Sequence, residues 1–254
     1  MKQITKTVAL STVMALSGCY GDSLCDSYDT LPALDRNADG ITDYRFQFIG
    51  DSILGYHEIT CKSVSHYLAF ELNEQIETHA WTGAVLSEIA EQYVAPVDEQ
   101  ADYEYVILNG GLNDLLANVN LTDRELTPCD CNGEVNHDAC MDEVDQITAR
   151  MTSLINNIQD TSSAQVGLVM YYPADSSDTF IGSCTPYVEA LNNNYRSLAN
   201  VDPTLQVIET YGAGQQVIPK LNVLGNDKYH PSPEGSQQMA YQVKEQLGLL
   251  ELNQ

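Results

Sequence analysis

The sequence predicts an α/β protein, a three-layer αβα sandwich built around a mainly parallel sheet of about five strands. Strand-like and helical stretches alternate along the chain, which is the order that βαβ units produce. Some strand-like stretches, such as 103–108 (YEYVIL), are largely apolar, as strands buried on both faces of a parallel sheet are. The length of 254 residues, 43% of them hydrophobic, suits one domain with a single core.

Hydrophobic periodicity places the elements in order. Strands are expected at 44–49, 75–80, 103–108, 165–172 and 205–208. Helices are expected at 59–72, 84–94, 187–199 and in a longer segment around 144–158. A last helix is expected from Pro233 to Leu247, because Ser232 is a favoured N-cap and proline is favoured at the first helical position.

The charge balance excludes one class of partner. The chain has 11 Lys and Arg residues against 36 Asp and Glu residues, a formal net charge of −25. Nucleic-acid binding needs a basic face, so no nucleic-acid partner is expected. Strongly anionic substrates are disfavoured for the same reason, and nothing in the sequence implies a protein partner.

The N-terminal segment resembles a lipoprotein signal peptide, which we place at residues 1–18. Lys2 and Lys6 start it, and an apolar run follows that is shorter than the ~20 residues needed to span a bilayer. The run ends in Leu16-Ser17-Gly18-Cys19, which resembles a bacterial lipobox. Cleavage before Cys19, lipidation of its thiol, and export to a lipid-anchored position in a bacterial envelope are therefore expected.

The mature chain divides into a lead-in and one domain. We expect residues 19–44 to be a lipidated tether and Asp-rich lead-in, and 45–254 to be the folded domain, with a Cys-rich insertion at about 121–140. The lead-in carries Asp35, Asn37, Asp39 and Asp43 at the spacing of a calcium loop, but Phe46 stands where an EF-hand has its bidentate glutamate. The segment is thus either a shorter calcium loop or an acidic, solvated turn.

The cysteines agree with export. Besides Cys19 there are six, an even number that predicts up to three disulfides with 15 possible pairings. They are Cys25, Cys61, Cys129, Cys131, Cys140 and Cys184. A zinc site of three of these cysteines with His137 is the alternative, which an oxidising compartment disfavours.

Polar clusters follow the predicted strands, where open α/β sheets bind ligands. Ser52 follows the first strand at a turn into a helix, and its hydroxyl becomes a nucleophile only if a base takes its proton. His230 can be that base, with Asp227 three residues earlier to orient its ring. The backbone N–H groups of Ser52 and Gly83 and the side-chain amide of Asn113 are candidate donors to an oxyanion. The alternative for Asn113 is that it only caps the helix that begins near Asp114.

These clusters resemble four sequence blocks of the SGNH (GDSL-type) hydrolase superfamily over about residues 46–247. The matching segments are Gly50-Asp51-Ser52, Gly83, Gly111-x-Asn113-Asp114 and Asp227-x-x-His230-Pro231. Ile53 stands where leucine is usual in the family. The resemblance implies a flavodoxin-like fold and a cofactor-independent serine hydrolase of lipid, short-chain or carbohydrate acyl esters.

By the same resemblance, Ser52 is the nucleophile, His230 the base and Asp227 its partner. Ser52, Gly83 and Asn113 would form the oxyanion hole. The rival hypothesis is a surface binding or adhesion lipoprotein with a relic active site. The intact set of serine, asparagine, aspartate and histidine argues against that rival.

Overall fold

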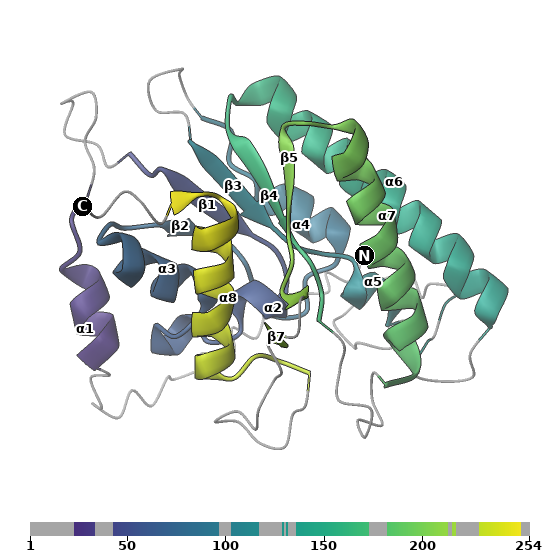
Figure 1. Ribbon diagram of the computed structural model, residues 1–254, viewed down its shortest axis with the longest axis horizontal. Helices are drawn as coiled ribbons and strands as arrows, with labels where there is room; N and C mark the ends of the chain where they lie inside the picture. The colour runs from purple at the N-terminus through teal and green to yellow at the C-terminus, as the bar shows by residue number, and fades with distance from the viewer. Residues whose placement is uncertain are drawn as a thin grey trace, which may run out of the picture.

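The computed structural model describes residues 23–33, 43–96, 103–116, 129, 131, 136–172, 182–212, 215–216 and 229–249. Within them one sheet contains β1 (Phe46–Ile49), β2 (Glu77–Thr78), β3 (Tyr105–Leu108), β4 (Gln165–Val169) and β5 (Leu205–Ile208). The strand order is β2-β1-β3-β4-β5 and every neighbouring pair is parallel (Figure 1). A short antiparallel pair, β6 (Tyr211–Gly212) with β7 (Gln215–Gln216), is separate from this sheet. The predicted α/β fold with a five-stranded parallel sheet is confirmed.

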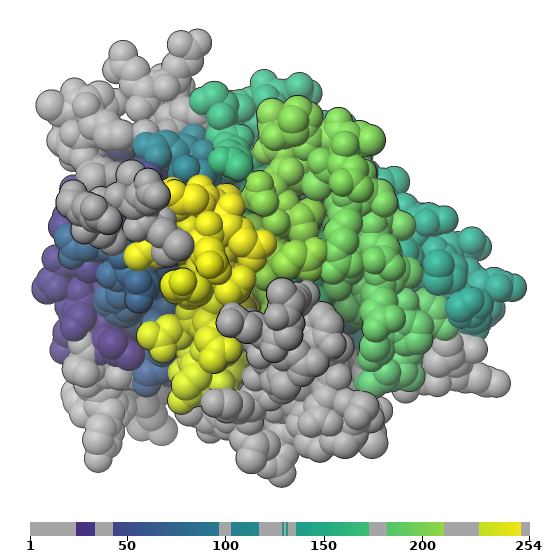
Figure 2. All heavy atoms as spheres, viewed as in Figure 1, coloured from purple at the N-terminus to yellow at the C-terminus, as the bar shows by residue number. Residues whose placement is uncertain are grey.

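Helices cover both faces of the sheet. The α-helices are α1 (Ser23–Asp29), α2 (Ser52–Gly55), α3 (Val64–Leu72), α4 (Leu86–Gln92), α5 (Leu112–Leu115), α6 (His137–Thr161), α7 (Thr185–Val201) and α8 (Pro233–Gln246), and short 3₁₀ turns lie at Glu58–Thr60 and Gly182–Cys184. One layer has α8 packed on α3, and the other has α7 and α4 packed on α6 (Figure 1). Figure 2 shows α8, in yellow, on the surface that faces the viewer. Right-handed crossovers produce this arrangement, because the chain leaves β1 toward β2 in one direction and then returns past it to β3 and β4.

That reversal creates a switch point between β1 and β3. The segments that leave the carboxyl ends of these two strands diverge to opposite faces, and the crevice between them is where such sheets bind ligands. The segment after β1 begins at Gly50, and the segment after β3 begins at Asn109. The two polar segments singled out in the sequence therefore meet at the binding edge of the sheet.

Burial explains why these residues form these elements. All four residues of β1 are buried, as are three of the four in β3, so both strands have helices on both faces. In α6 the buried residues recur at helical spacing and include Val144, Ile147 and Met151. Ser232 caps α8 as predicted, accepting a hydrogen bond from the Gly235 backbone N–H at 3.1 Å.

The structure corrects the predicted helix over 59–72. A 3₁₀ turn ends at Thr60, Cys61 adopts a left-handed conformation (φ 53°), and α3 begins only after its N-cap, Ser63. The left-handed residue breaks the helical path, although the hydrophobic period runs through it.

Part of the expected lead-in is folded. Residues 23–29 form α1, and Cys25 is bonded to Cys61. The Tyr28 hydroxyl donates to the Ile76 carbonyl at 2.7 Å, which ties α1 to the segment before β2. Among the described residues, no helix combines the length and the apolar character needed to cross a bilayer.

Candidate active site

Ser52 stands at the turn between β1 and α2. It is the first residue of α2, 8% exposed, and follows the N-cap Asp51, whose carboxylate accepts from the Ile53 backbone N–H at 2.9 Å. The turn is tied to the segment after β2, because the Trp81 backbone N–H donates to the Gly50 carbonyl at 3.1 Å. The serine is therefore held at the carboxyl end of β1, as predicted.

The Asp51 carboxylate accepts hydrogen bonds that stabilise the serine turn. It is 1% exposed, and it accepts from the Asn109 amide at 2.7 Å and from the Tyr171 hydroxyl at 2.6 Å as well as from Ile53. Burial raises the pKa of Asp51, and these three donors act against that rise. The group thus joins β1 to the ends of β3 and β4 beneath Ser52.

His230 lies against the other end of the same short helix. Its ring stacks on Tyr56, the C-cap of α2, with centroids 3.9 Å apart and an interplanar angle of 12°. The segment is held from two more sides, since Tyr172 donates to the Tyr229 carbonyl at 2.7 Å and a ring nitrogen of His57 lies 2.9 Å from the Pro231 carbonyl oxygen. His230 is 7% exposed, so the histidine is built into the site and is not a surface residue.

The second and third sequence blocks are bonded to each other. Gly83 is buried with φ +84°, a left-handed turn conformation that favours glycine. Directly after it, the Ala84 carbonyl accepts from the Asn113 side-chain amide at 2.9 Å, and the Leu86 N–H donates to the Asp114 carboxylate at 3.0 Å. These two bonds fix the relative positions of Gly83 and Asn113, the two candidate oxyanion donors outside the serine turn.

The capping alternative for Asn113 is wrong. The N-cap of α5 is Gly111, with φ +109° and no side-chain cap bond, and Asn113 lies inside the helix. Its amide group carries two N–H donors, of which Ala84 takes one.

Asp114 is held by a buried network from α6. Arg150 donates to Asp114 at 3.1 Å and to Glu143 at 2.7 Å, and Glu143 is 3% exposed. Burial raises the pKa of Asp114 to about 6, with Glu143 adding to the rise and Arg150 opposing it. The sequence alone does not reveal this network, because its members are 29 and 36 residues apart in the chain or lie on one helix.

Several predicted residues lie outside the described part of the chain. Asp227, the expected partner of His230, is one of them, and so is Cys19. Of the expected calcium loop only Asp43 is described, and it is buried. The described residues contain no cluster of three or more His, Cys, Asp or Glu side chains suited to a metal ion. The calcium site stays a prediction.

All six remaining cysteines form disulfides. The pairs are Cys25–Cys61, Cys129–Cys140 and Cys131–Cys184. This confirms the disulfide prediction and removes the zinc alternative, because the three cysteines of the proposed zinc site carry no free thiolate. Near the site, Tyr171 and Tyr172 are buried, whereas Trp81 is 53% exposed.

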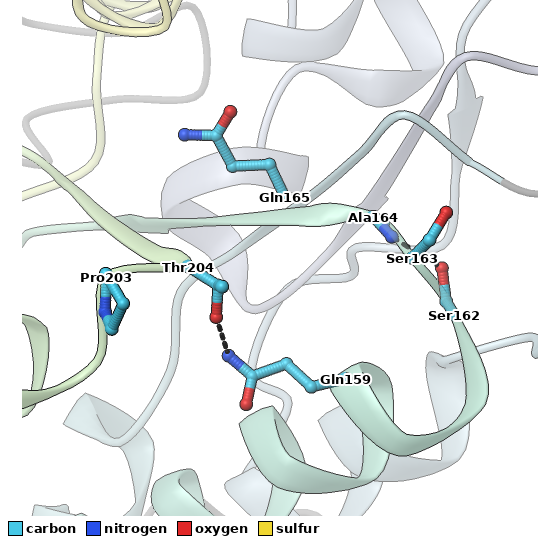
Figure 3. Close-up of a pocket in the computed structure, with 7 residues that line it drawn as sticks. All are labelled: Gln159, Ser162, Ser163, Ala164, Gln165, Pro203 and Thr204. Atoms are coloured by element: carbon cyan, nitrogen blue, oxygen red, sulfur yellow. Dashed lines mark hydrogen bonds between the residues drawn. The ribbon is translucent and has the colours of Figure 1, made fainter.

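A cavity of about 520 Å³ lies at the amino ends of β4 and β5, away from the carboxyl ends that carry Ser52 (Figure 3). It adjoins the start of β4 at Gln165 and the residues before β5, Pro203 and Thr204. The Gln159 amide, from α6, donates to the Thr204 hydroxyl at 2.7 Å across it (Figure 3). None of its lining residues belongs to the candidate catalytic set.

Comparison with known proteins agrees with the fold. The model of the GDSL-like lipase/acylhydrolase family matches residues 48–238. No curated protein sequence matches the chain significantly.

Solved structures share the fold at low identity. A member of the lipolytic G-D-S-L family from Veillonella parvula superposes with a TM-score of 0.55 at 16% identity, covering 82% of this chain and 98% of that one. A GDSL-like lipase from Bacteroides thetaiotaomicron gives 0.53 at 15%, covering 89% and 96%. An acetyl xylan esterase from Butyrivibrio proteoclasticus gives 0.52 at 15%, covering 83% and 66%.

Proposed function

Because the chain belongs to the GDSL-like lipase/acylhydrolase family, a family of carboxylic ester hydrolases, we propose that it cleaves esters through an acyl-enzyme on Ser52. The observation that carries the proposal is the stacking of His230 on Tyr56. Tyr56 directly follows the four-residue helix that begins with Ser52, so base and nucleophile are held at two ends of one helical turn. No cofactor is needed for this chemistry.

The proposed reaction has two steps. Ser52 Oγ attacks the ester carbonyl while its proton passes to His230, and the histidine then protonates the leaving alcohol. In the second step His230 takes a proton from water, the hydroxide attacks the acyl-enzyme, and the acid leaves as the Ser52 hydroxyl is restored. Asp227 orients the imidazole and stabilises its charged form in this scheme.

The oxyanion donors are proposed to be the backbone N–H groups of Ser52 and Gly83 and the side-chain amide of Asn113. The bond from Asn113 to the Ala84 carbonyl supports this assignment, because it fixes the plane of the amide. One N–H of that group is held by the carbonyl, so the other has a defined direction. Pre-oriented donors of this kind are what stabilises a developing negative charge.

Labelling with a fluorophosphonate probe tests the nucleophile, since only an activated serine reacts with it. The wild-type protein should be labelled once, at Ser52, and Ser52→Ala should lose both labelling and ester turnover. Ser65→Ala is a matched control, because Ser65 is also buried and lies on α3 away from the proposed chemistry. Turnover by folded Ser52→Ala near the wild-type rate would refute the assignment and would point to another nucleophile. Wild-type protein that neither takes the label nor cleaves esters would favour the relic-site binding lipoprotein.

The substrate is proposed to be a neutral acyl ester of a lipid, a short-chain alcohol or a carbohydrate. The net charge of −25 disfavours anionic substrates. Two of the structurally similar proteins are a lipase and an acetyl xylan esterase, which supports testing both kinds of ester. A series of p-nitrophenyl esters of increasing acyl length, run beside acetylated xylan, would separate these classes.

We also propose that the protein is exported and anchored through lipid on Cys19. Three disulfides support an oxidising compartment, and the lipobox-like Leu16-Ser17-Gly18-Cys19 supplies the modification site. In a bacterial host, Cys19→Ser should move the enzyme from the membrane fraction to the soluble fraction. Membrane association unchanged by that substitution would contradict the anchor.

A further inference from the structure

One tyrosine hydroxyl connects the two halves of the proposed site. Tyr171 follows β4 and is 2% exposed. Its hydroxyl donates to the Asp51 carboxylate at 2.6 Å and accepts from the Leu112 backbone N–H at 3.0 Å. Asp51 precedes Ser52, and Leu112 precedes Asn113, so a single oxygen atom spans the nucleophile turn and the segment of the oxyanion asparagine.

From this geometry we propose that Tyr171 is a positioning residue, whose hydroxyl sets the distance between Ser52 and Asn113. The proposal rests on the function proposed above for those two residues. Tyr171 does not touch the reacting atoms. It acts through the two backbone segments that carry them.

The hydroxyl has few alternatives to these two bonds. Burial raises the pKa of Tyr171 well above its ordinary value, so the oxygen keeps its proton and remains a donor to Asp51. The Leu112 N–H belongs to the first turn of α5, where helical N–H groups have no partner within the helix, and Gly111 offers no side-chain cap. The tyrosine oxygen therefore caps the first turn of α5 from the segment that follows β4.

The tyrosine itself is held firmly. Its backbone N–H donates to Asn192 at 3.2 Å, and its carbonyl accepts from the amide of the same asparagine at 2.8 Å. Asn192 lies on α7 and is 7% exposed. Because the backbone of Tyr171 is bonded at both polar groups to a packed helix, the hydroxyl is a fixed reference point for Asp51 and Leu112.

Tyr171→Phe tests the proposal, since it removes only the oxygen and keeps the ring. The matched control is Tyr28→Phe. The Tyr28 hydroxyl also donates once and accepts once, to the Ile76 carbonyl at 2.7 Å and from the Ile76 N–H at 3.3 Å, but it lies on α1. For both variants kcat and KM on a short p-nitrophenyl ester, the rate of fluorophosphonate labelling and Tm are measured, with the assays run well below both Tm values.

We expect kcat and the labelling rate of Tyr171→Phe to fall by roughly 10-fold or more with KM changed less than about threefold, since small displacements of reacting groups cost rate without altering binding. Tyr28→Phe should lower Tm yet keep kcat within about twofold. A Tyr171→Phe enzyme with wild-type kcat overturns the proposal whatever its Tm. Replacing Tyr171 with 4-aminophenylalanine, which returns a donor, should recover part of the lost kcat, and no recovery would equally count against it.

If the proposed function is wrong, the measurements on Ser52 show it, and those on Tyr171 do not. Wild-type protein would then take no fluorophosphonate at Ser52, or Ser52→Ala would still turn over ester. The two failures are therefore distinguishable within one set of measurements.

Discussion

Replacing Asn113 with alanine separates catalysis from stability. The substitution removes a side-chain amide that donates to the Ala84 carbonyl at 2.9 Å and, in the proposed mechanism, also to the oxyanion. Loss of the first bond, a partly buried one, should lower the free energy of unfolding by about 1 kcal/mol. Loss of an oxyanion donor should lower kcat by roughly 10²–10³-fold, or about 3–4 kcal/mol, with little change in KM, because that bond strengthens only in the transition state.

The assay pairs kcat and KM on a short p-nitrophenyl ester with Tm on the same preparation. Asn194→Ala is the control, because the Asn194 amide also makes a partly buried bond, from α7 to the Thr148 hydroxyl of α6 at 3.0 Å. It should reproduce the loss of Tm and leave kcat unchanged. A folded Asn113→Ala enzyme with kcat within threefold of wild type would refute the oxyanion role and leave the two backbone donors to account for the hole.

Three further perturbations test the surroundings of the site. Asp114→Asn should remove a pH dependence of stability. The folded pKa of Asp114, about 6, lies above the unfolded value, so the stability that this group contributes in the wild type rises as pH falls from about 7 toward 4. The Tm difference between variant and wild type should change over that window, and a constant difference would contradict the prediction. Gly55→Ala should destabilise the protein and depress turnover, because a Cβ there would lie 2.5 Å from the Ala80 carbonyl oxygen, and unchanged Tm would contradict the close approach. Cys25→Ser with Cys61→Ser should lower the free energy of unfolding by about 2–4 kcal/mol in urea titrations, and no shift in midpoint would show that α1 needs no covalent link.

The sheet could be predicted from sequence because its signals are local. The central strands are short apolar runs separated by helical periods, and the right-handed crossover rule leaves few arrangements for them. Ser52, Gly83, Asn113 and His230 could be singled out because each lies next to a predicted strand or helix end. The serine turn and the histidine segment indeed meet across α2.

What the sequence could not reveal depends on tertiary contacts. The break at Cys61 arises from a left-handed residue that is bonded to Cys25, and no periodicity records that. The long helix begins at His137, after its N-cap Asn136, and not near Val144. Cys140, near its start, is bonded to Cys129, and no periodicity records that contact. The bonds of Tyr171 join residues 59 and 120 positions away, so the sequence shows only a tyrosine at the end of a strand.

The disulfides also determine what proteolytic cleavage does to the chain. The bond between Cys25 and Cys61 closes a ring around the serine turn, and the bond between Cys131 and Cys184 closes a second ring around α6 and β4. A single cut inside either ring leaves the two chain pieces covalently joined, so the nicked molecule stays one particle until it is reduced. The nick would therefore be visible on a reducing gel and hidden on a non-reducing one.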